Sequence, residues 1–192
     1  MKSHVYFKGN LLVALLAVLI LGQAQAEDKV ISDSATYTLD ACPITGQSLN
    51  AMGAPVIETI NDREVRFCCP ARINKYHEDE TANDAKLDTA IIEQQKDAYP
   101  LDTCVVLGGK LGGMGDPEDY VYKNRLVRFC CAGCVKTFEK APETYLAKLD
   151  AAVLEKERDN YPLDTCIVDG KPLGDAPVAL IIGNRLVLLH CE

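Results

Sequence analysis

The segment RLVRFCCAGC (residues 125–134) places a strand-like pattern directly before a cluster of thiols. Arg125 to Phe129 carries the branched and aromatic residues that are typical of β-strands. Cys130, Cys131 and Cys134 follow at once. The segment therefore predicts both an element of the fold and a chemical centre. Its thiols are candidates for metal ligands, disulfide partners or reactive groups.

The chain repeats itself around this segment. YTLDAC begins at Tyr37, and YPLDTC begins at Tyr99 and again at Tyr161. REVRFCC (residues 63–69) matches RLVRFCC (residues 125–131), and the third copy keeps NRLV near its end. So regular a period indicates a duplicated structural module. We therefore divide the chain into an N-terminal lead (27–36), repeat 1 (37–98), repeat 2 (99–160) and a truncated repeat 3 (161–192).

Each repeat predicts the same series of elements, which gives an α+β fold of tandem small modules. A Cys-bearing turn comes first, and a β-hairpin follows. Lys123-Asn124 and Gly183-Asn184 suit two-residue hairpin turns, and Asn61-Asp62 takes this place in repeat 1. A helix beginning at Pro142 comes next in repeat 2. Repeat 3 lacks such a helix, which leaves room for a protein partner there, and the lead 27–36 is expected to be loose.

The first 26 residues have the layout of a secretory signal peptide. A basic start precedes LLVALLAVLILG and then QAQA, which is a small-residue cleavage site after Ala26. The apolar run is shorter than the roughly 20 residues that span a bilayer. We therefore expect a secreted or periplasmic protein that is free of the membrane after cleavage.

Composition narrows the partners and the chemistry. The formal net charge of −8 and the absence of tryptophan make nucleic acid a poor partner. GGKLGGMG (residues 108–115) leads into a strand rather than a helix, which argues against a phosphate site. Because the sequence offers no nucleophile–base pair or carboxylate pair in a defined setting, we do not expect an enzyme.

The chain contains nine cysteines, and export would place them in an oxidising compartment where disulfides are common. Nine is an odd number, so at least one thiol is free, bound to metal or shared with another chain. In repeat 2, a strand end and a helix start can aim Cys130 and Cys134 at one point, and Cys104 can close the site from the preceding turn. Soft sulfur ligands suit Zn or Cu.

Cys104, Cys130 and Cys134 are the preferred ligands. Cys131 is their rival or the fourth ligand, because adjacent residues of a strand point in different directions. The other two repeats offer weaker sets of ligands or disulfide partners. These are Cys42, Cys68 and Cys69 in repeat 1, and Cys166, His190 and Cys191 in repeat 3.

Repeat 2 also resembles a known family. The turn cysteine Cys104, the Phe129-Cys130 to Cys134 motif, Phe138 and the PETYL motif (residues 142–146) are similar to the TRASH/YHS-type metal-binding domain. The resemblance implies a small zinc-knuckle-like fold and a role in heavy-metal trafficking, resistance or sensing. Repeat 1 departs from the family pattern because Arg72 stands where Cys134 would be.

Two other interpretations stay open. The cysteines can be disulfide staples of a structural or interaction protein, with one pair in each repeat, such as Cys166–Cys191. A loop of this size contributes about 3 kcal/mol of stability by the chain-entropy estimate. Alternatively, Cys131-Ala-Gly-Cys134 can act as a thiol oxidoreductase, although the surrounding sequence lacks a thioredoxin-like βαβ pattern.

Overall fold

The computed structural model describes residues 29–190. Four helices, one short 3-10 helix and seven strands lie in this range. In chain order they are β1 (Val30–Asp33), η1 (Leu49–Met52), β2 (Val56–Ile60), β3 (Arg63–Phe67), α1 (Ala71–His77), α2 (Glu80–Gln95), β4 (Glu118–Tyr122), β5 (Arg125–Phe129), α3 (Ala132–Phe138), α4 (Pro142–Glu157), β6 (Val178–Ile182) and β7 (Arg185–Leu189).

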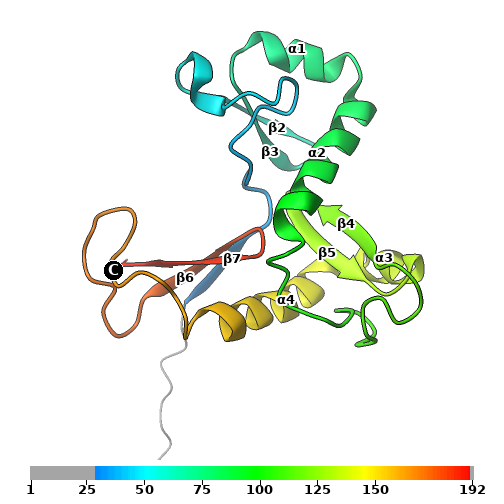
Figure 1. Cartoon of the computed structure of the whole chain (residues 1–192), viewed down its shortest axis with the longest axis vertical. Coiled ribbons are helices and arrows are strands. Elements are labelled where there is room, and N and C mark those ends of the chain that lie inside the picture. The colour runs from blue at the N-terminus through cyan, green and yellow to red at the C-terminus, as the bar shows by residue number, and fades with distance from the viewer. Residues whose placement is uncertain (1–28, 191–192) are drawn as a thin grey trace, which may run out of the picture.

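The α+β class expected from the sequence is confirmed. Strands β2 and β3, β4 and β5, and β6 and β7 form three antiparallel hairpins. The turns lie at the positions expected from the sequence, and Asn61, Lys123 and Gly183 each have a positive φ there, as two-residue hairpin turns require. Figure 1 shows three lobes, with one hairpin in each.

The first two lobes have their own apolar cores, built from matching positions. Phe67 and Tyr76 are fully buried in the first lobe, and Phe129 and Phe138 take their places in the second. The rings stack edge-to-face or tilted, 5.5 Å apart in both pairs. Aromatic pairs of this kind add stability beyond the area they bury.

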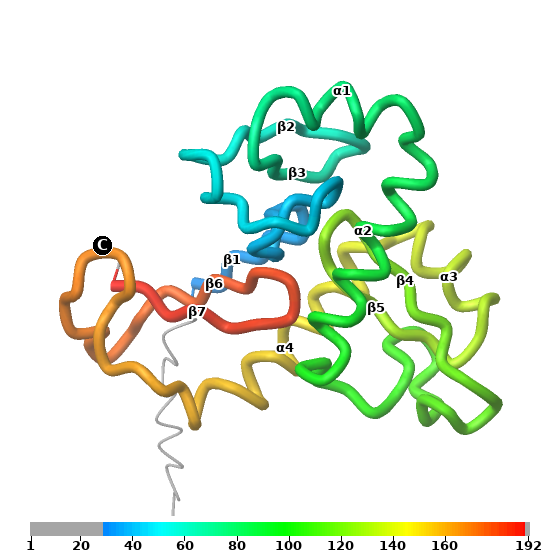
Figure 2. The backbone as a smooth tube through the Cα atoms, turned by 45° about the horizontal axis from the view of Figure 1, so that its top comes forward, coloured from blue at the N-terminus to red at the C-terminus, as the bar shows by residue number. Residues whose placement is uncertain are grey.

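The two long helices connect the lobes (Figure 2). In α2, Leu87 is buried in the first core, whereas Ile92 packs against the second. In α4, Leu149 is buried in the second core, and Val153 belongs to the third. The earlier turns of each helix thus pack in the core of its own repeat, and its last turns pack against the next lobe.

Hydrogen bonds from the last turn of each long helix also hold the next hairpin; we call this contact the polar joint. The Gln95 side chain of α2 accepts a hydrogen bond from the Leu126 N–H at 2.9 Å and donates to the Asn124 carbonyl at 2.9 Å. At the matching place in α4, Glu157 accepts from the Leu186 N–H at 2.7 Å. Because buried polar groups are costly unless paired, these bonds fix how the lobes meet.

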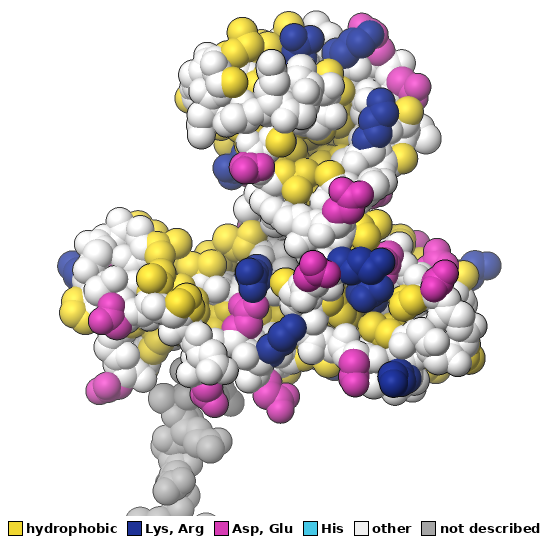
Figure 3. Space-filling view, in the orientation of Figure 1, with side chains coloured by type: hydrophobic (Ala, Val, Ile, Leu, Met, Phe, Trp, Pro, Cys, Tyr) yellow, Lys and Arg dark blue, Asp and Glu magenta, His cyan; other side chains and the backbone are white. Residues whose placement is uncertain are grey.

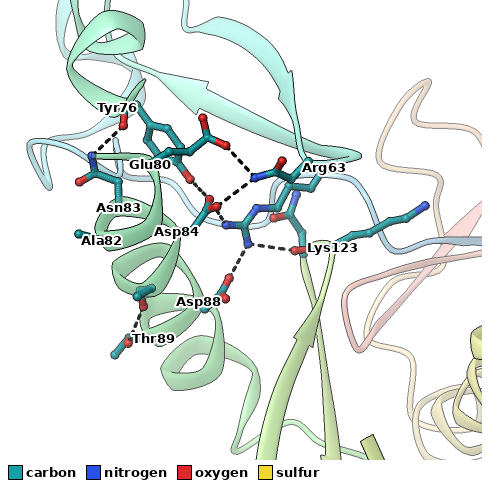
Figure 4. A network of polar contacts seen from close by, with 12 residues as sticks. Arg63, Tyr76, Glu80, Ala82, Asn83, Asp84, Asp88, Thr89 and Lys123 are labelled. Atoms are coloured by element: carbon teal, nitrogen blue, oxygen red, sulfur yellow. Dashed lines mark hydrogen bonds and ion pairs between the residues drawn. The ribbon is translucent and has the colours of Figure 1, made fainter. Parts of the chain in front are cut away.

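Buried arginines mark the same joints. Arg63 pairs with Asp84 and Asp88 of α2 and donates to the Lys123 carbonyl of the next hairpin turn at 3.2 Å (Figure 4). In the next repeat, the fully buried Arg125 pairs with Asp150 of α4 at 2.6 Å. The sequence analysis predicted neither of these two ion pairs.

The N-terminal lead is not loose, and this expectation was wrong. Its residues Val30–Asp33 form β1, which pairs in parallel with Ala179–Ile182 of β6. The three-stranded sheet has the order β1-β6-β7. An extended segment gains backbone hydrogen bonds when it pairs with the open edge of a strand. The repeats give no sign of this pairing, because β1 lies outside them. The signal peptide and cleavage site lie outside the described residues.

On the face shown in Figure 3, Lys and Arg side chains lie among Asp and Glu side chains rather than in a patch of one sign. Several large apolar side chains are exposed on repeat 3, among them Ile167 and Val168. The protein partner expected there stays a prediction.

Candidate metal centre

The turn that carries the first cysteine has the same backbone bonds in all three repeats. In repeat 2 the Cys104 N–H donates to the Gly109 carbonyl at 2.8 Å, and the Gly108 N–H returns to the Cys104 carbonyl at 2.7 Å. Gly108 has a φ of +70°, a conformation that glycine adopts without strain. Equivalent bonds close the turns at Cys42 and Cys166. The turn therefore presents a thiol in a fixed direction in each repeat.

Strand β5 and helix α3 deliver the other thiols of repeat 2. Cys130 follows directly after β5, and Cys131 has an extended backbone with φ of −166° just before α3. The Cys134 N–H donates to the Cys131 carbonyl at 3.0 Å, so the chain turns immediately. This turn brings Cys134 back toward the strand end and toward Cys104.

Cys104, Cys130 and Cys134 meet at one point. Their three sulfur atoms lie within 4.8 Å of one another, and all three residues are buried, each at most 5% exposed. The Cys130 and Cys134 sulfurs are 3.8 Å apart. Sulfurs about 2.3 Å from a zinc ion at tetrahedral corners are separated by about 3.8 Å. The group could therefore hold a metal ion with little movement of its side chains.

Cys131 approaches this group from one side. Its sulfur is 3.7 Å from that of Cys134, but Cys131 is half-buried, unlike the other three. The structure thus separates the two adjacent cysteines as the strand geometry predicts: Cys130 points into the buried group and Cys131 lies at its edge. In this arrangement Cys131 can complete a four-sulfur site or leave the fourth position open.

The surroundings of each thiol set the direction in which its pKa departs from the ordinary value. Burial raises the pKa of Cys130, and burial also raises the pKa of Cys134 well above its ordinary value. Burial alone would raise the pKa of Cys104 too, but backbone N–H groups, including those of Leu107 and Cys130, point at its sulfur and hold its pKa below the ordinary value. Such N–H donors orient and stabilise a metal-bound thiolate.

Repeat 1 keeps most of this arrangement but lacks the third ligand. Cys42 and Cys68 are buried and in hydrogen-bonding contact, and the Thr45 hydroxyl lies 3.8 Å from the Cys68 sulfur. Cys69 is half-buried, like Cys131. Arg72 occupies the position of Cys134, and its Nε atom is buried without a hydrogen-bond partner among the described residues. Within the described chain, only the repeat 2 thiols converge as a group of three.

Repeat 3 has a different set of side chains at the same place. Cys166 is buried in its turn. His190 lies 3.5 Å from the Asp169 carboxylate, which also accepts a hydrogen bond from the Cys166 thiol. Cys191 lies outside the described residues. Asp169 was missed at the sequence level, although it follows its turn cysteine by three residues, as Thr45 and Leu107 follow theirs.

Comparison with known proteins adds no relatives. No protein-family model, curated protein or solved structure matches this chain. None of the helices in the described part of the chain is long and apolar enough to cross a membrane. Residues 29–190 thus form an α+β fold with one buried group of cysteines that could hold a metal ion.

Proposed function

We propose that this protein binds a soft or borderline metal ion, Zn(II) or Cu(I), through the thiolates of Cys104, Cys130 and Cys134. The observation that carries the proposal is the convergence of three buried sulfurs within 4.8 Å. The three thiols come from a turn, a strand end and a helix start, so they do not meet merely because they are neighbours in sequence. Thiolates prefer these metals to the harder Mg²⁺ or Ca²⁺.

The N–H groups around Cys104 further support an ion over a simple thiol cluster. They stabilise negative charge on its sulfur, which is the form that binds metal. Cys130 and Cys134 would lose their protons when the ion enters, because a metal lowers the pKa of a coordinating thiol. The resemblance to TRASH/YHS-type domains supports a role in heavy-metal trafficking or sequestration, carried out after export by the N-terminal signal.

A second candidate function is that of a disulfide-stapled structural protein, and repeat 1 favours it. Cys42 and Cys68 are buried and in contact, with no third thiol converging on them in the described chain. A Cys42–Cys68 disulfide would close the turn onto the hairpin. The two functions are compatible, because one repeat can be stapled while the next binds an ion.

The test is to purify the mature protein from its native compartment and to measure bound metal and free thiols in the same sample. We expect about one ion per chain, held tightly enough to survive dialysis. Cys104→Ser and Cys134→Ser should each lose the ion, whereas Cys42→Ser, the matched turn cysteine of repeat 1, should keep it. A metal-free protein with eight of its nine cysteines oxidised would contradict the metal function and support the staple.

A further inference from the structure

The centre in repeat 2 contains one thiol more than the buried group requires. Cys134 has two sulfur neighbours at nearly equal distance, Cys130 at 3.8 Å and Cys131 at 3.7 Å. Cys130 is buried, whereas Cys131 is half-exposed and can be reached from solvent. The same sulfur of Cys134 thus belongs to a closed ion site and to an accessible dithiol.

We propose that Cys131 and Cys134 form a reversible disulfide that expels the ion from the centre. This inference rests on the metal function proposed above. The backbone already brings the pair together, since the Cys134 N–H donates to the Cys131 carbonyl at 3.0 Å across a single turn. Rotation of the two side chains is enough to bring sulfurs 3.7 Å apart into bonding distance.

The oxidant is a small disulfide, such as oxidised glutathione. The Cys131 thiolate attacks one sulfur of this molecule, its S–S bond breaks, and one small thiolate leaves. The Cys134 sulfur then leaves the ion, attacks the Cys131 sulfur of the mixed disulfide, and expels the second small thiolate. Two protein sulfurs are oxidised, one small disulfide is reduced, and one of the released thiolates takes the Cys131 proton and the other a proton from solvent.

Attack begins at Cys131 because oxidation follows access, and Cys131 is the least buried of the four thiols. After the disulfide forms, the ion keeps only Cys104 and Cys130 as protein ligands. Two thiolates hold Zn(II) far less tightly than three, so the ion leaves. Reduction of the disulfide restores the complete group.

Repeat 1 contains a natural control for this device. Cys69 also follows the buried cysteine at the end of its strand, and it is half-buried like Cys131. Arg72 stands where the resolving thiol would be. Cys69 can therefore form a mixed disulfide with a small molecule but has no Cys134 equivalent to resolve it.

The experiment uses the reduced full chain loaded with Zn(II), wild type and the variants Cys131→Ser and Cys69→Ser. Zinc uptake is measured first. Oxidised glutathione is then added, zinc release is followed with a chromogenic chelator, and the disulfides are mapped by mass spectrometry. We expect one zinc ion released for each Cys131–Cys134 disulfide, release at least tenfold slower in Cys131→Ser, and unchanged release in Cys69→Ser.

The outcomes separate this inference from the proposed function. A wild-type chain that takes up no zinc overturns this inference and removes Zn(II) from the proposed function. A chain that binds zinc but loses it equally fast in wild type and Cys131→Ser overturns only the disulfide switch, and so does a disulfide that joins other cysteines. If Cys131→Ser fails to bind zinc while Cys69→Ser binds it, Cys131 is an obligatory ligand, and its role as a separate redox thiol is wrong.

Discussion

Repeats 1 and 2 have nearly the same scaffold and different centres. Both have a cysteine turn, a hairpin that ends in two cysteines, a short helix and a long helix. Many positions of their cores match, as Leu87 and Leu149 do. Position 72 in repeat 1 holds arginine, whereas the matching position 134 in repeat 2 holds cysteine. On this shared scaffold, a single side chain therefore decides whether the thiols of a repeat make a group of three.

The largest expected effect comes from giving repeat 1 the missing thiol. Arg72→Cys should create a second ion site from Cys42, Cys68 and the new residue, so the chain should bind two Zn(II) ions rather than one. A micromolar site corresponds to about 8 kcal/mol of binding free energy. The stoichiometry is measured by titration calorimetry with elemental analysis.

Arg72→Ser is the matched control, since it removes the same guanidinium without adding a thiol. It should still bind one ion. If Arg72→Cys also binds only one, position 72 is not what separates the two repeats, and the comparison fails.

The next effect concerns the buried ion pairs at equivalent places. Asp150→Ala leaves the fully buried Arg125 without its carboxylate and should cost about 3–5 kcal/mol of unfolding free energy. Asp88→Ala should cost about 1 kcal/mol or less, because Asp88 is 39% exposed and Arg63 keeps Asp84. Urea unfolding of both variants measures the difference. Equal losses of unfolding free energy would show that the two carboxylates contribute equally to stability.

Counted per pH unit, the dependence of ion binding on pH is a smaller effect than the loss of the Arg125–Asp150 pair. Burial raises the pKa of Cys130 and Cys134, so both thiols hold their protons near neutral pH and must release them to the ion. Protons compete with the ion, so its affinity should fall as pH falls, about tenfold per pH unit for each proton released. Competition titrations with a zinc chelator between about pH 6 and about pH 8 test this. An affinity that does not change with pH would mean that the ion binds elsewhere.

Local signals predicted much of the fold. The turn residues Asn61-Asp62, Lys123-Asn124 and Gly183-Asn184 identified all three hairpins, because few residues tolerate a positive φ. Pro142 identified the first residue of α4. The short helix α1 in repeat 1 was not predicted from the sequence.

Long-range contacts were harder to predict. Nothing local in Arg125 says that it will be fully buried, because its partners Asp150 and Asn184 lie far along the chain. The pairing of β1 with β6 joins a segment outside the repeats to one inside them. The expected ligands Cys104, Cys130 and Cys134 do converge. Their choice over Cys131 came from strand geometry, and the preference for repeat 2 came from comparison with repeat 1.

The parallel pairing of β1 with β6 has a consequence for folding during synthesis. Roughly 150 residues separate the two strands, so this is a contact of very high sequence separation. At about 5–20 residues per second, β1 leaves the ribosome about 7–30 s before β6 can meet it. The first two lobes can fold in that interval, while the backbone hydrogen-bonding groups of β1, which carries the apolar Val30 and Ile31, remain unpaired. Completion of the third sheet is therefore expected to be the last step of folding, and β1 is the segment that most needs protection until then.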